Sequence, residues 1–271
     1  MIERRYDGAD KPLKRALSEL FPEVSYSELS ACLRRRDVKV DGARAAGDFL
    51  LKKGAVVRIY PQKTREIKVL YEDADLLACY KPKGIASEGD LSFSTLVTAE
   101  RAGVKLMHRL DTNTDGILLF AKNEIAYQEI YLAMKEGRIR KEYLAEVYGV
   151  PHISGETDLD YYYKKDSARE RAMISDVPRE GFIPVHLSFS VVEKHDETAL
   201  LSVVIHKGKM HQIRAMLAHY GCFILGDGKY GSDRVNRLLG VHKTRLTACA
   251  VQFSFSPSSP LSRLNDLRIE L

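Results

Sequence analysis

The stretch HRLDTNTDGILLFAKN, residues 108–123, carries the pattern that decides how the chain folds. A polar segment containing Asp111 runs directly into five apolar residues, Ile117 to Ala121. This apolar run, followed by Asn123 as a candidate cap, predicts a buried strand and then a helix. Asp111 then falls in a loop before a strand, where functional side chains are commonly displayed. By pattern alone, a turn or cap role is the commoner explanation for such an aspartate.

The chain around this stretch predicts a domain of many short strands and a few helices. The expected elements are a helix over 124–134, a strand over 142–149, a strand pair over 185–194 and 199–208, and a helix over 211–220. On the first helix Tyr127, Ile130, Tyr131 and Met134 have the spacing of one apolar face. Gly137 and Gly221 are placed to end the two helices.

Residues 12–60 predict a separate, small α–β module. Ser25 with Glu28 three residues later forms a capping-box pattern that starts a second helix. The segments VKV and AVVRIY, with an Asp41-Gly42 turn, predict a hairpin-like unit. PQKTREIK has the composition of a polar linker. We therefore divide the chain into residues 1–65 and residues 66–271.

Positive charge is concentrated in the first of these parts. Residues 1–65 hold 15 Lys and Arg against 9 Asp and Glu, a net +6, whereas the remainder holds 27 against 28, a net −1. Such an asymmetry indicates a module that meets a polyanion, although a solvated basic face would have the same count. Arg34, Arg35 and Arg36 end the second helix; they are candidate phosphate ligands, or cations that favour a helix C-terminus.

The composition bounds the protein class. A length of 271 residues fits a catalytic domain plus a small module. No apolar stretch is long enough to span a bilayer, and the charged start MIERRYDGAD does not resemble a secretory signal, so we expect a cytoplasmic protein without a membrane partner. Four widely spaced cysteines predict reduced thiols. The histidines between 206 and 219 lack the spacing of a metal site, and no phosphate-binding glycine motif is present.

Four segments of the chain resemble the RluA-type RNA pseudouridine synthases. HRLDTNTDGILLFAK is similar to the family's H-R-L-D-x-x-T-S-G-L-L-L-x-A-K, YKPKGI to its K-P-x-G, and KEYLAEVYG to its K-x-Y-x-A-x-V-x-G. HQIRAMLAHYGCFILGDGKYG is similar to H-Q-I-R-x-H-L-A-x-x-G-x-P-I-x-G-D-x-x-Y-G. The resemblance covers residues 67 to about 255, and residues 12–60 resemble an S4-type RNA-binding domain. The departures from the family pattern are Asp115, Lys207, Lys209, Met210, Met216, Cys222 and Phe223.

The resemblance implies a fold and a site. The expected fold is α+β: a mixed, mainly antiparallel sheet with flanking helices and a central cleft, preceded by the S4-like module. Asp111, Tyr143 and Arg214 are implied as catalytic residues that converge in the cleft. For substrate binding, the resemblance and the charge pattern give Arg109, which would fill the stack left by an extruded uridine, His108, which would support the loop, Ile213, and the three arginines 34–36.

The implied reaction breaks the N1–C1′ bond of a uridine, turns the base and rejoins it through C5, so no metal or other cofactor is expected. A carboxylate near C1′ can be a nucleophile, stabilise oxocarbenium charge, or act as a base at C2′, and the sequence leaves these roles open. An arginine within about 4–6 Å keeps such a carboxylate ionised, and the resemblance implies Arg214 as that partner; a bidentate pair would also fix the aim of the carboxylate. Tyr143 can stack on the uracil and relay a proton.

We therefore expect a monomeric RNA pseudouridine synthase that acts on structured RNA, ribosomal RNA in preference to transfer RNA. A non-catalytic RNA-binding or ribosome-assembly protein on the same scaffold is the alternative. A hydrolase that releases the base is a third possibility, and it would need a second carboxylate. Asp115 is the nearby candidate for that role.

Overall fold

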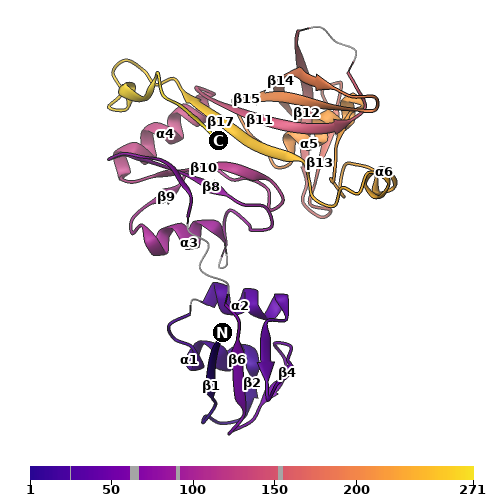
Figure 1. Ribbon diagram of the computed structural model, residues 1–271. Helices are drawn as coiled ribbons and strands as arrows, with labels where there is room; N and C mark the ends of the chain where they lie inside the picture. The colour runs from indigo at the N-terminus through magenta and orange to yellow at the C-terminus, as the bar shows by residue number, and fades with distance from the viewer. Residues whose placement is uncertain (25, 62–66, 90–91, 152–154) are drawn as a thin grey trace. The chain divides into compact units, whose positions relative to one another are not determined.

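The computed structural model describes residues 1–24, 26–61, 67–89, 92–151 and 155–271. The chain forms two compact units, Met1–Ile67 and Lys68–Leu271, and each is treated by itself (Figure 1). Ser25 of the expected capping box and residues 62–66 of the expected linker lie outside the described residues. No helix in the described ranges is both long and apolar enough to cross a membrane.

The first unit packs two helices against a small sheet. Its elements are β1 (Ile2–Arg5), β2 (Lys11–Pro12), α1 (Leu13–Leu20), α2 (Tyr26–Arg35), β3 (Val38–Val40), β4 (Ala43–Arg44), β5 (Leu50–Leu51) and β6 (Val56–Ile59). The main sheet has the order β1-β6-β3-β4, and β2 pairs with β5. The turn at Asp41 and Gly42 joins β3 to β4, and AVVRIY supplies β6 on the other edge of β3. Apolar residues from both helices and from the strands form one core, which explains why so short a segment can fold.

The second unit is built on a 12-stranded sheet. Nine of its strands follow the order β13-β12-β14-β15-β11-β17-β10-β8-β7, with β16, β18 and β9 attached beside this path. The strands are β7 (Val69–Glu72), β8 (Leu76–Lys81), β9 (Lys105–Leu106), β10 (Asp115–Ala121), β11 (Ile139–Tyr148), β12 (Glu156–Asp166), β13 (Arg171–Ser175), β14 (Ile183–Lys194), β15 (Thr198–Ile205), β16 (Phe223–Ile224), β17 (Leu246–Phe253) and β18 (Arg268–Glu270). Only β10 and β17 pair in parallel among the described strands, so the expected mixed, mainly antiparallel sheet is confirmed.

The position of β10 fixes the loop that carries Asp111. Residues 116–121 of the strand are all buried, as the apolar run predicts. Gly116 has a φ of +120°, and a Cβ there would lie 2.2 Å from the carbonyl oxygen of Ala248. No other residue type fits so close to β17, so this glycine sets where the two strands meet. The loop before β10 is therefore anchored at one point of the sheet.

Helices flank the sheet (Figure 1): α3 (Phe93–Glu100), α4 (Glu124–Glu136), α5 (Gln212–Tyr220) and α6 (Asp233–Leu238), with a 3₁₀ turn at Ser262–Leu264. The Asn123 side chain accepts a hydrogen bond from the Ala126 backbone N–H at 2.9 Å, and Gly137 ends α4 in the left-handed region, both as predicted. The buried face of α4 consists of Ala126, Ile130 and Ala133. Tyr131, expected on the apolar face, is instead exposed.

Candidate active site

A cleft of about 1320 Å³ opens in the second unit. Its walls come from the loop before β10, the start of β11, the end of β12, the turn before α5 and the C-terminal half of α4. Asp111, Tyr143 and Arg214 all line it, so the structure brings the three expected catalytic residues to one cavity. His108, Arg109 and Ile213 also line it.

Hydrogen bonds on both sides hold the Asp111 loop. The Ser87 hydroxyl donates to the carbonyl of Leu110 at 2.7 Å and accepts from the Leu110 N–H at 2.9 Å. The Thr114 N–H donates to the carbonyl of Asp111 at 3.0 Å. The backbone on either side of the carboxylate is thus tied down, and such anchoring keeps a reacting group in one geometry.

Lys81, from the YKPKGI segment, is a fully buried cation beneath this loop. Its ammonium group donates to the carbonyls of Ile85 at 2.9 Å and Pro82 at 3.1 Å. Burial lowers the pKa of Lys81 to about 8, although the negative charges of Asp115 and Asp111 act in the opposite direction. Lys81 therefore closes the turn that packs under the Asp111 loop and supplies positive potential there.

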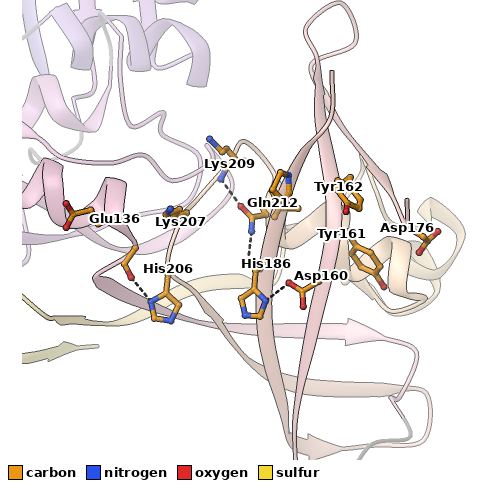
Figure 2. A pocket seen from close by; sticks show the side chains of 13 residues that line it. Glu136, Asp160, Tyr161, Tyr162, Asp176, His186, His206, Lys207, Lys209 and Gln212 are labelled. Carbon is orange, nitrogen blue, oxygen red and sulfur yellow. Dashed lines mark hydrogen bonds and ion pairs between the residues drawn. The ribbon is translucent and has the colours of Figure 1, made fainter. Parts of the chain in front are cut away.

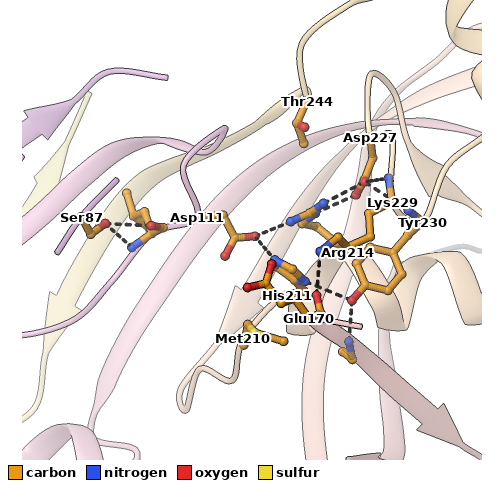
Figure 3. Close-up of polar contacts among 12 residues, drawn as sticks. Ser87, Asp111, Glu170, Met210, His211, Arg214, Asp227, Lys229, Tyr230 and Thr244 are labelled. Carbon is orange, nitrogen blue, oxygen red and sulfur yellow. Dashed lines mark hydrogen bonds and ion pairs between the residues drawn. The ribbon is translucent and has the colours of Figure 1, made fainter. Parts of the chain in front are cut away.

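Arg214 joins two carboxylates (Figure 3). Its Nη1 donates to Oδ2 of Asp111 at 2.8 Å, and its Nε and Nη2 donate to the two oxygens of Asp227 at 2.7 and 2.8 Å. Arg214 therefore pairs with Asp111, as the resemblance implies, but through one nitrogen, and the two-pronged edge of the guanidinium binds Asp227. Asp227 takes the Nε–Nη2 edge of the guanidinium, and Nη1 makes the single hydrogen bond to Asp111.

Asp227 is the anchor of this network. Its side chain is fully buried, and it also accepts from the backbone N–H groups of Lys229 at 2.8 Å and Tyr230 at 3.2 Å. Burial alone would raise the pKa of Asp227, but these hydrogen bonds and the Arg214 charge hold the pKa below its usual value. The pKa of Arg214 is raised, because its two carboxylate partners outweigh the cost of burial. Both groups are thus ionised together, and Arg214 is fixed in its aim at Asp111.

The Asp111 carboxylate remains open to a substrate. Its side chain is 26% exposed, and the recorded contacts from Arg214 and His211 both use Oδ2. Among the described residues this leaves Oδ1 as the oxygen directed to other partners. An ionised carboxylate with one oxygen fixed and one available can act as a nucleophile, a charge stabiliser or a base.

His211 was not singled out from the sequence. It begins α5 with a φ of +57°, a conformation that costs energy outside glycine, and its Nε2 lies 3.8 Å from Oδ2 of Asp111. Its Nδ1 lies 3.1 Å from the Tyr230 hydroxyl, which accepts the Ala172 N–H at 2.6 Å. That hydroxyl can donate its own proton to Nδ1, and in this tautomer Nε2 carries the ring hydrogen and faces Asp111. Burial lowers the pKa of His211, which favours this neutral form.

Gln212 holds the turn before α5 from its other side, where a second cavity of about 680 Å³ lies (Figure 2). Its amide nitrogen donates to the carbonyl of His186 at 2.9 Å, and its amide oxygen accepts from the Lys209 N–H at 3.0 Å. These bonds attach the turn to β14, and so fix where α5 presents Arg214.

Tyr143 forms part of the apolar floor of the cleft. It is buried on β11, on the same face as Ala145 and Val147, opposite Ala248 of β17. Burial raises the pKa of Tyr143, and the nearby charge of Asp111 raises it further, so the phenol is neutral. Ile213 is also buried and lines the same space. A neutral phenol and an aliphatic side chain provide the kind of surface on which a uracil ring can pack.

The two residues before Leu110 have different settings. The Nε2 atom of His108 accepts the Leu119 N–H at 3.3 Å, which ties the loop to β10. Burial and the charge of Lys141 lower the pKa of His108 to about 3, so this ring is neutral and can accept that bond. Arg109 is exposed at the cleft, where its Nη1 lies 3.1 Å from the Glu88 carboxylate. A weak, exposed ion pair of this kind leaves Arg109 available to a larger partner.

Arginines 34–36 lie in the first unit, at the end of α2. Arg35 forms ion pairs with Glu28 at 2.7 Å and Asp37 at 2.9 Å, so it stabilises its own module. Arg34 and Arg36 are exposed. Arg35 is exposed as well, but its guanidinium is engaged by Glu28 and Asp37, so Arg34 and Arg36 are the better candidates for phosphate contacts.

Charge in the cleft differs from the near-neutral total of residues 66–271. The residues that line it include nine Lys or Arg and three Asp or Glu. The basic ones are Arg109, Lys135, Lys141, Lys164, Lys165, Lys207, Lys209, Arg214 and Lys229. Folding thus gathers cations along one cavity, which suits a polyanionic substrate.

Asp115, the candidate second carboxylate, is occupied by structural contacts. Its Oδ2 accepts the Tyr80 hydroxyl at 2.8 Å, and its Oδ1 accepts the Thr247 hydroxyl at 2.7 Å. Lys83 lies 3.4 Å from the same Oδ1. Asp115 does not line the cleft, so it is badly placed to activate a water molecule there.

Comparisons with known proteins identify the family of this chain. The family model for RNA pseudouridylate synthase matches residues 75–219. Ribosomal large subunit pseudouridine synthase C of Rickettsia conorii is 29% identical, over 83% of this chain and 82% of that protein. The Escherichia coli protein of the same name is 27% identical, over 95% of this chain and 89% of its own length.

Solved structures show the same fold. Human RNA Pseudouridylate Synthase Domain Containing 1 superposes with a TM-score of 0.62 at 22% identity, and covers 79% of this chain and 92% of that one. Human RNA Pseudouridylate Synthase Domain Containing 4 gives 0.59 at 21% identity, over 75% and 87% of the two chains. The family model matches more than half of the residues of this chain. The chain therefore belongs to the RNA pseudouridylate synthase family and is an RNA pseudouridine synthase.

Proposed function

We propose that this enzyme converts specific uridines of large-subunit ribosomal RNA to pseudouridine, in the cytoplasm, with Asp111 as the reacting carboxylate. The observation that carries the proposal is the Asp111–Arg214–Asp227 network, which holds one carboxylate oxygen at 2.8 Å and leaves the other to the cleft. The names of the relatives, ribosomal large subunit pseudouridine synthase C, support the choice of RNA. We also propose that the enzyme acts as a monomer.

The residues divide the work as follows. The uridine leaves its stack, and Arg109, which is exposed at the edge of the cleft, takes the vacated place. The uracil packs on Tyr143 and Ile213, and Asp111 meets the sugar. Arg214 keeps Asp111 ionised as it leaves water, and His108 holds the loop at β10. Asp111 can act as a nucleophile, a charge stabiliser or a base, and each of these roles requires an ionised carboxylate.

We further propose that residues 1–65 are an S4-like RNA-binding module. Its net charge of +6 and the exposed Arg34 and Arg36 support contacts with phosphates, which give affinity rather than sequence recognition. A variant that lacks residues 1–67 should bind RNA more weakly and with a flatter dependence on salt, and should keep the cleft intact. An unchanged salt slope would assign the module to another task.

Two other functions are less well supported. A non-catalytic RNA-binding protein needs cationic side chains, but it does not need a fully buried Asp227 that aims an arginine at an open carboxylate. A base-releasing hydrolase needs a second carboxylate at the cleft, and Asp115 is committed to Tyr80 and Thr247.

Pseudouridine mapping on total RNA tests the proposal. RNA from cells with and without the gene should differ at one or a few uridines of the large-subunit ribosomal RNA. The difference should disappear when the gene is restored and persist when the restored gene encodes Asp111→Asn. Sites that map to transfer RNA alone, or a full rescue by Asp111→Asn, would overturn it.

A further inference from the structure

Tyr131 is an aromatic side chain that stands in the cleft. It lies in α4, where Ala126, Ile130 and Ala133 form the buried face, and it is 51% exposed. Met134 and Lys135, one turn further along the helix, line the same cavity. A tyrosine that remains half exposed beside a reaction cleft has a face available for a ligand.

A second ring supports Tyr131 from behind. The rings of Tyr127 and Tyr131 are stacked, with centroids 6.3 Å apart and planes inclined by 15°. Tyr127 packs against the hydrophobic core of the unit, and the ammonium group of Lys105 lies 5.0 Å from its ring centroid. Tyr131 therefore rests on a ring that is itself held by the core and by a cation.

The composition of the cleft indicates what would cover Tyr131. Nine Lys or Arg line the cavity against three Asp or Glu, so its ligand is a polyanion. A polynucleotide joins an anionic backbone to flat bases, and each base has a face that can stack on a tyrosine ring. Lys135, beside Tyr131 at the rim, is placed for the phosphate of the same nucleotide.

We propose that Tyr131 is a stacking platform for an unpaired base of the substrate RNA, next to the target uridine, with Lys135 as its phosphate contact. This inference rests on the proposed function, because it gives that substrate a second point of attachment in the same cleft. It adds a contact that selects RNA with an unpaired neighbour beside the modified uridine.

The arrangement of α4 favours this role over a purely structural one. Tyr127 is partly buried against the hydrophobic core, whereas Tyr131 remains half exposed beside the cleft. Ile125, on the same helix, is 63% exposed and lies outside the cleft. It is therefore a matched control: an exposed apolar side chain on α4 that no RNA in the cleft should cover.

Fluorescence tests the contact directly, because the chain contains no tryptophan. Tyr131→Trp places a single indole on the platform, and Ile125→Trp places one on the same helix away from the cleft. Total RNA from cells that lack the gene is the probe. Stacking should quench the emission of Tyr131→Trp strongly and leave that of Ile125→Trp nearly unchanged. Equal quenching of the two, or none for Tyr131→Trp, would overturn the inference.

Kinetics on the same RNA give the second measurement. Tyr131→Ala should raise the apparent KM by about ten- to hundredfold, as expected for one lost stacked base, and leave kcat within about twofold of wild type. Tyr131→Phe should retain the wild-type KM, because it keeps the ring, and so should Ile125→Ala. An unchanged KM in Tyr131→Ala would refute the platform.

The two proposals fail in different ways. If the modified uridine maps outside ribosomal RNA, the proposed substrate is wrong. The KM comparison then still measures the contribution of Tyr131 to binding the RNA that is modified. If wild type modifies no uridine, the proposed function is wrong, and the fluorescence comparison still decides the platform, because it needs binding and no turnover.

Discussion

Replacing Asp227 by asparagine should disable the enzyme, although Asp227 does not contact the substrate in the proposed mechanism. Oδ1 of Asp227 accepts Nη2 of Arg214 and the backbone N–H groups of Lys229 and Tyr230, and Oδ2 accepts Nε of Arg214. In Asp227→Asn one oxygen becomes an NH₂ group, which cannot accept a hydrogen bond. In one orientation this group faces Nε, 2.7 Å away in wild type, and in the other it faces the two backbone donors.

The magnitude follows from burial. The Asp227 side chain is fully buried, so the substitution leaves a buried guanidinium without one of its two counter-charges. Breaking such a pair costs about 3–5 kcal/mol of unfolding free energy. Arg214 then moves, and Asp111 loses the group that aims it. A misplacement of about 1 Å at a reacting group lowers turnover by about 10²-fold.

Urea unfolding and single-turnover pseudouridine formation measure the two effects. The pKa of Asp227 lies below its value in the unfolded chain, so its contribution is complete above that unfolded value and is lost only as the pH falls through the folded one. The difference between wild type and Asp227→Asn should therefore stay constant between about pH 5 and 8.

Asp176→Asn is the matched control. Asp176 is 74% exposed and pairs with His219 at 3.1 Å, so its loss should change stability by less than about 1 kcal/mol and leave turnover unchanged. If Asp227→Asn unfolds at the same urea concentration as wild type and keeps full turnover, Arg214 does not depend on Asp227, and the reasoning about the network is refuted.

Three further predictions concern neighbouring groups. Tyr143→Phe keeps the buried ring but removes the neutral phenol, so RNA affinity should hold while single-turnover rates fall by about 10²-fold or more; an unchanged rate would exclude proton relay through the hydroxyl. Burial lowers the pKa of Lys141 from 10.5 to about 8, so Lys141→Met should be more stable than wild type by up to about 3 kcal/mol at pH 7. Between these two pKa values the unfolded chain binds one more proton than the folded chain, so wild type gains stability as the pH rises. The stability advantage of Lys141→Met in urea unfolding should therefore shrink over this range. An advantage that stays constant would contradict the lowered pKa of Lys141. Asp115→Asn should cost about 1–3 kcal/mol in urea unfolding and leave the reaction product unchanged, whereas release of free uracil by wild type and its loss in this variant would favour a hydrolase.

Local patterns predicted the elements that carry the site. The run at 117–121 forms a buried strand because all five of its residues are apolar. Asn123 begins α4 because its side chain accepts a backbone hydrogen bond, and Gly137 ends it because glycine readily adopts the left-handed conformation. Long-range geometry could not be read in this way. The need for Gly116 depends on the carbonyl of Ala248, which is 132 residues away, and no local pattern encodes that approach.

The same limit applies to the site itself. Asp227 lies in the same sequence segment as Arg214. A helix and a turn separate them, so the sequence does not show whether Asp111 or Asp227 binds the two-pronged edge of the guanidinium. Tyr131 shows a different limit. A helical-spacing argument treats every tyrosine as apolar and therefore places Tyr131 on the buried face. In the structure the buried face of α4 is formed by Ala126, Ile130 and Ala133, and Tyr131 is exposed. Only the packed structure shows that Tyr131 points to the cleft.

Treating unmodified RNA with wild type and with Asp111→Asn, followed by mass analysis and carbodiimide mapping, tests the central claim most directly. Wild type should leave the RNA mass unchanged, because isomerisation rearranges atoms and removes none. It should also create carbodiimide-dependent reverse-transcription stops at specific positions, because the carbodiimide adduct of pseudouridine survives alkali and that of uridine does not. Asp111→Asn should bind the same RNA, remain folded and create no stops, because every proposed role needs the anion. Wild-type turnover by Asp111→Asn, or RNA lighter by one base after treatment with wild type, would contradict the account.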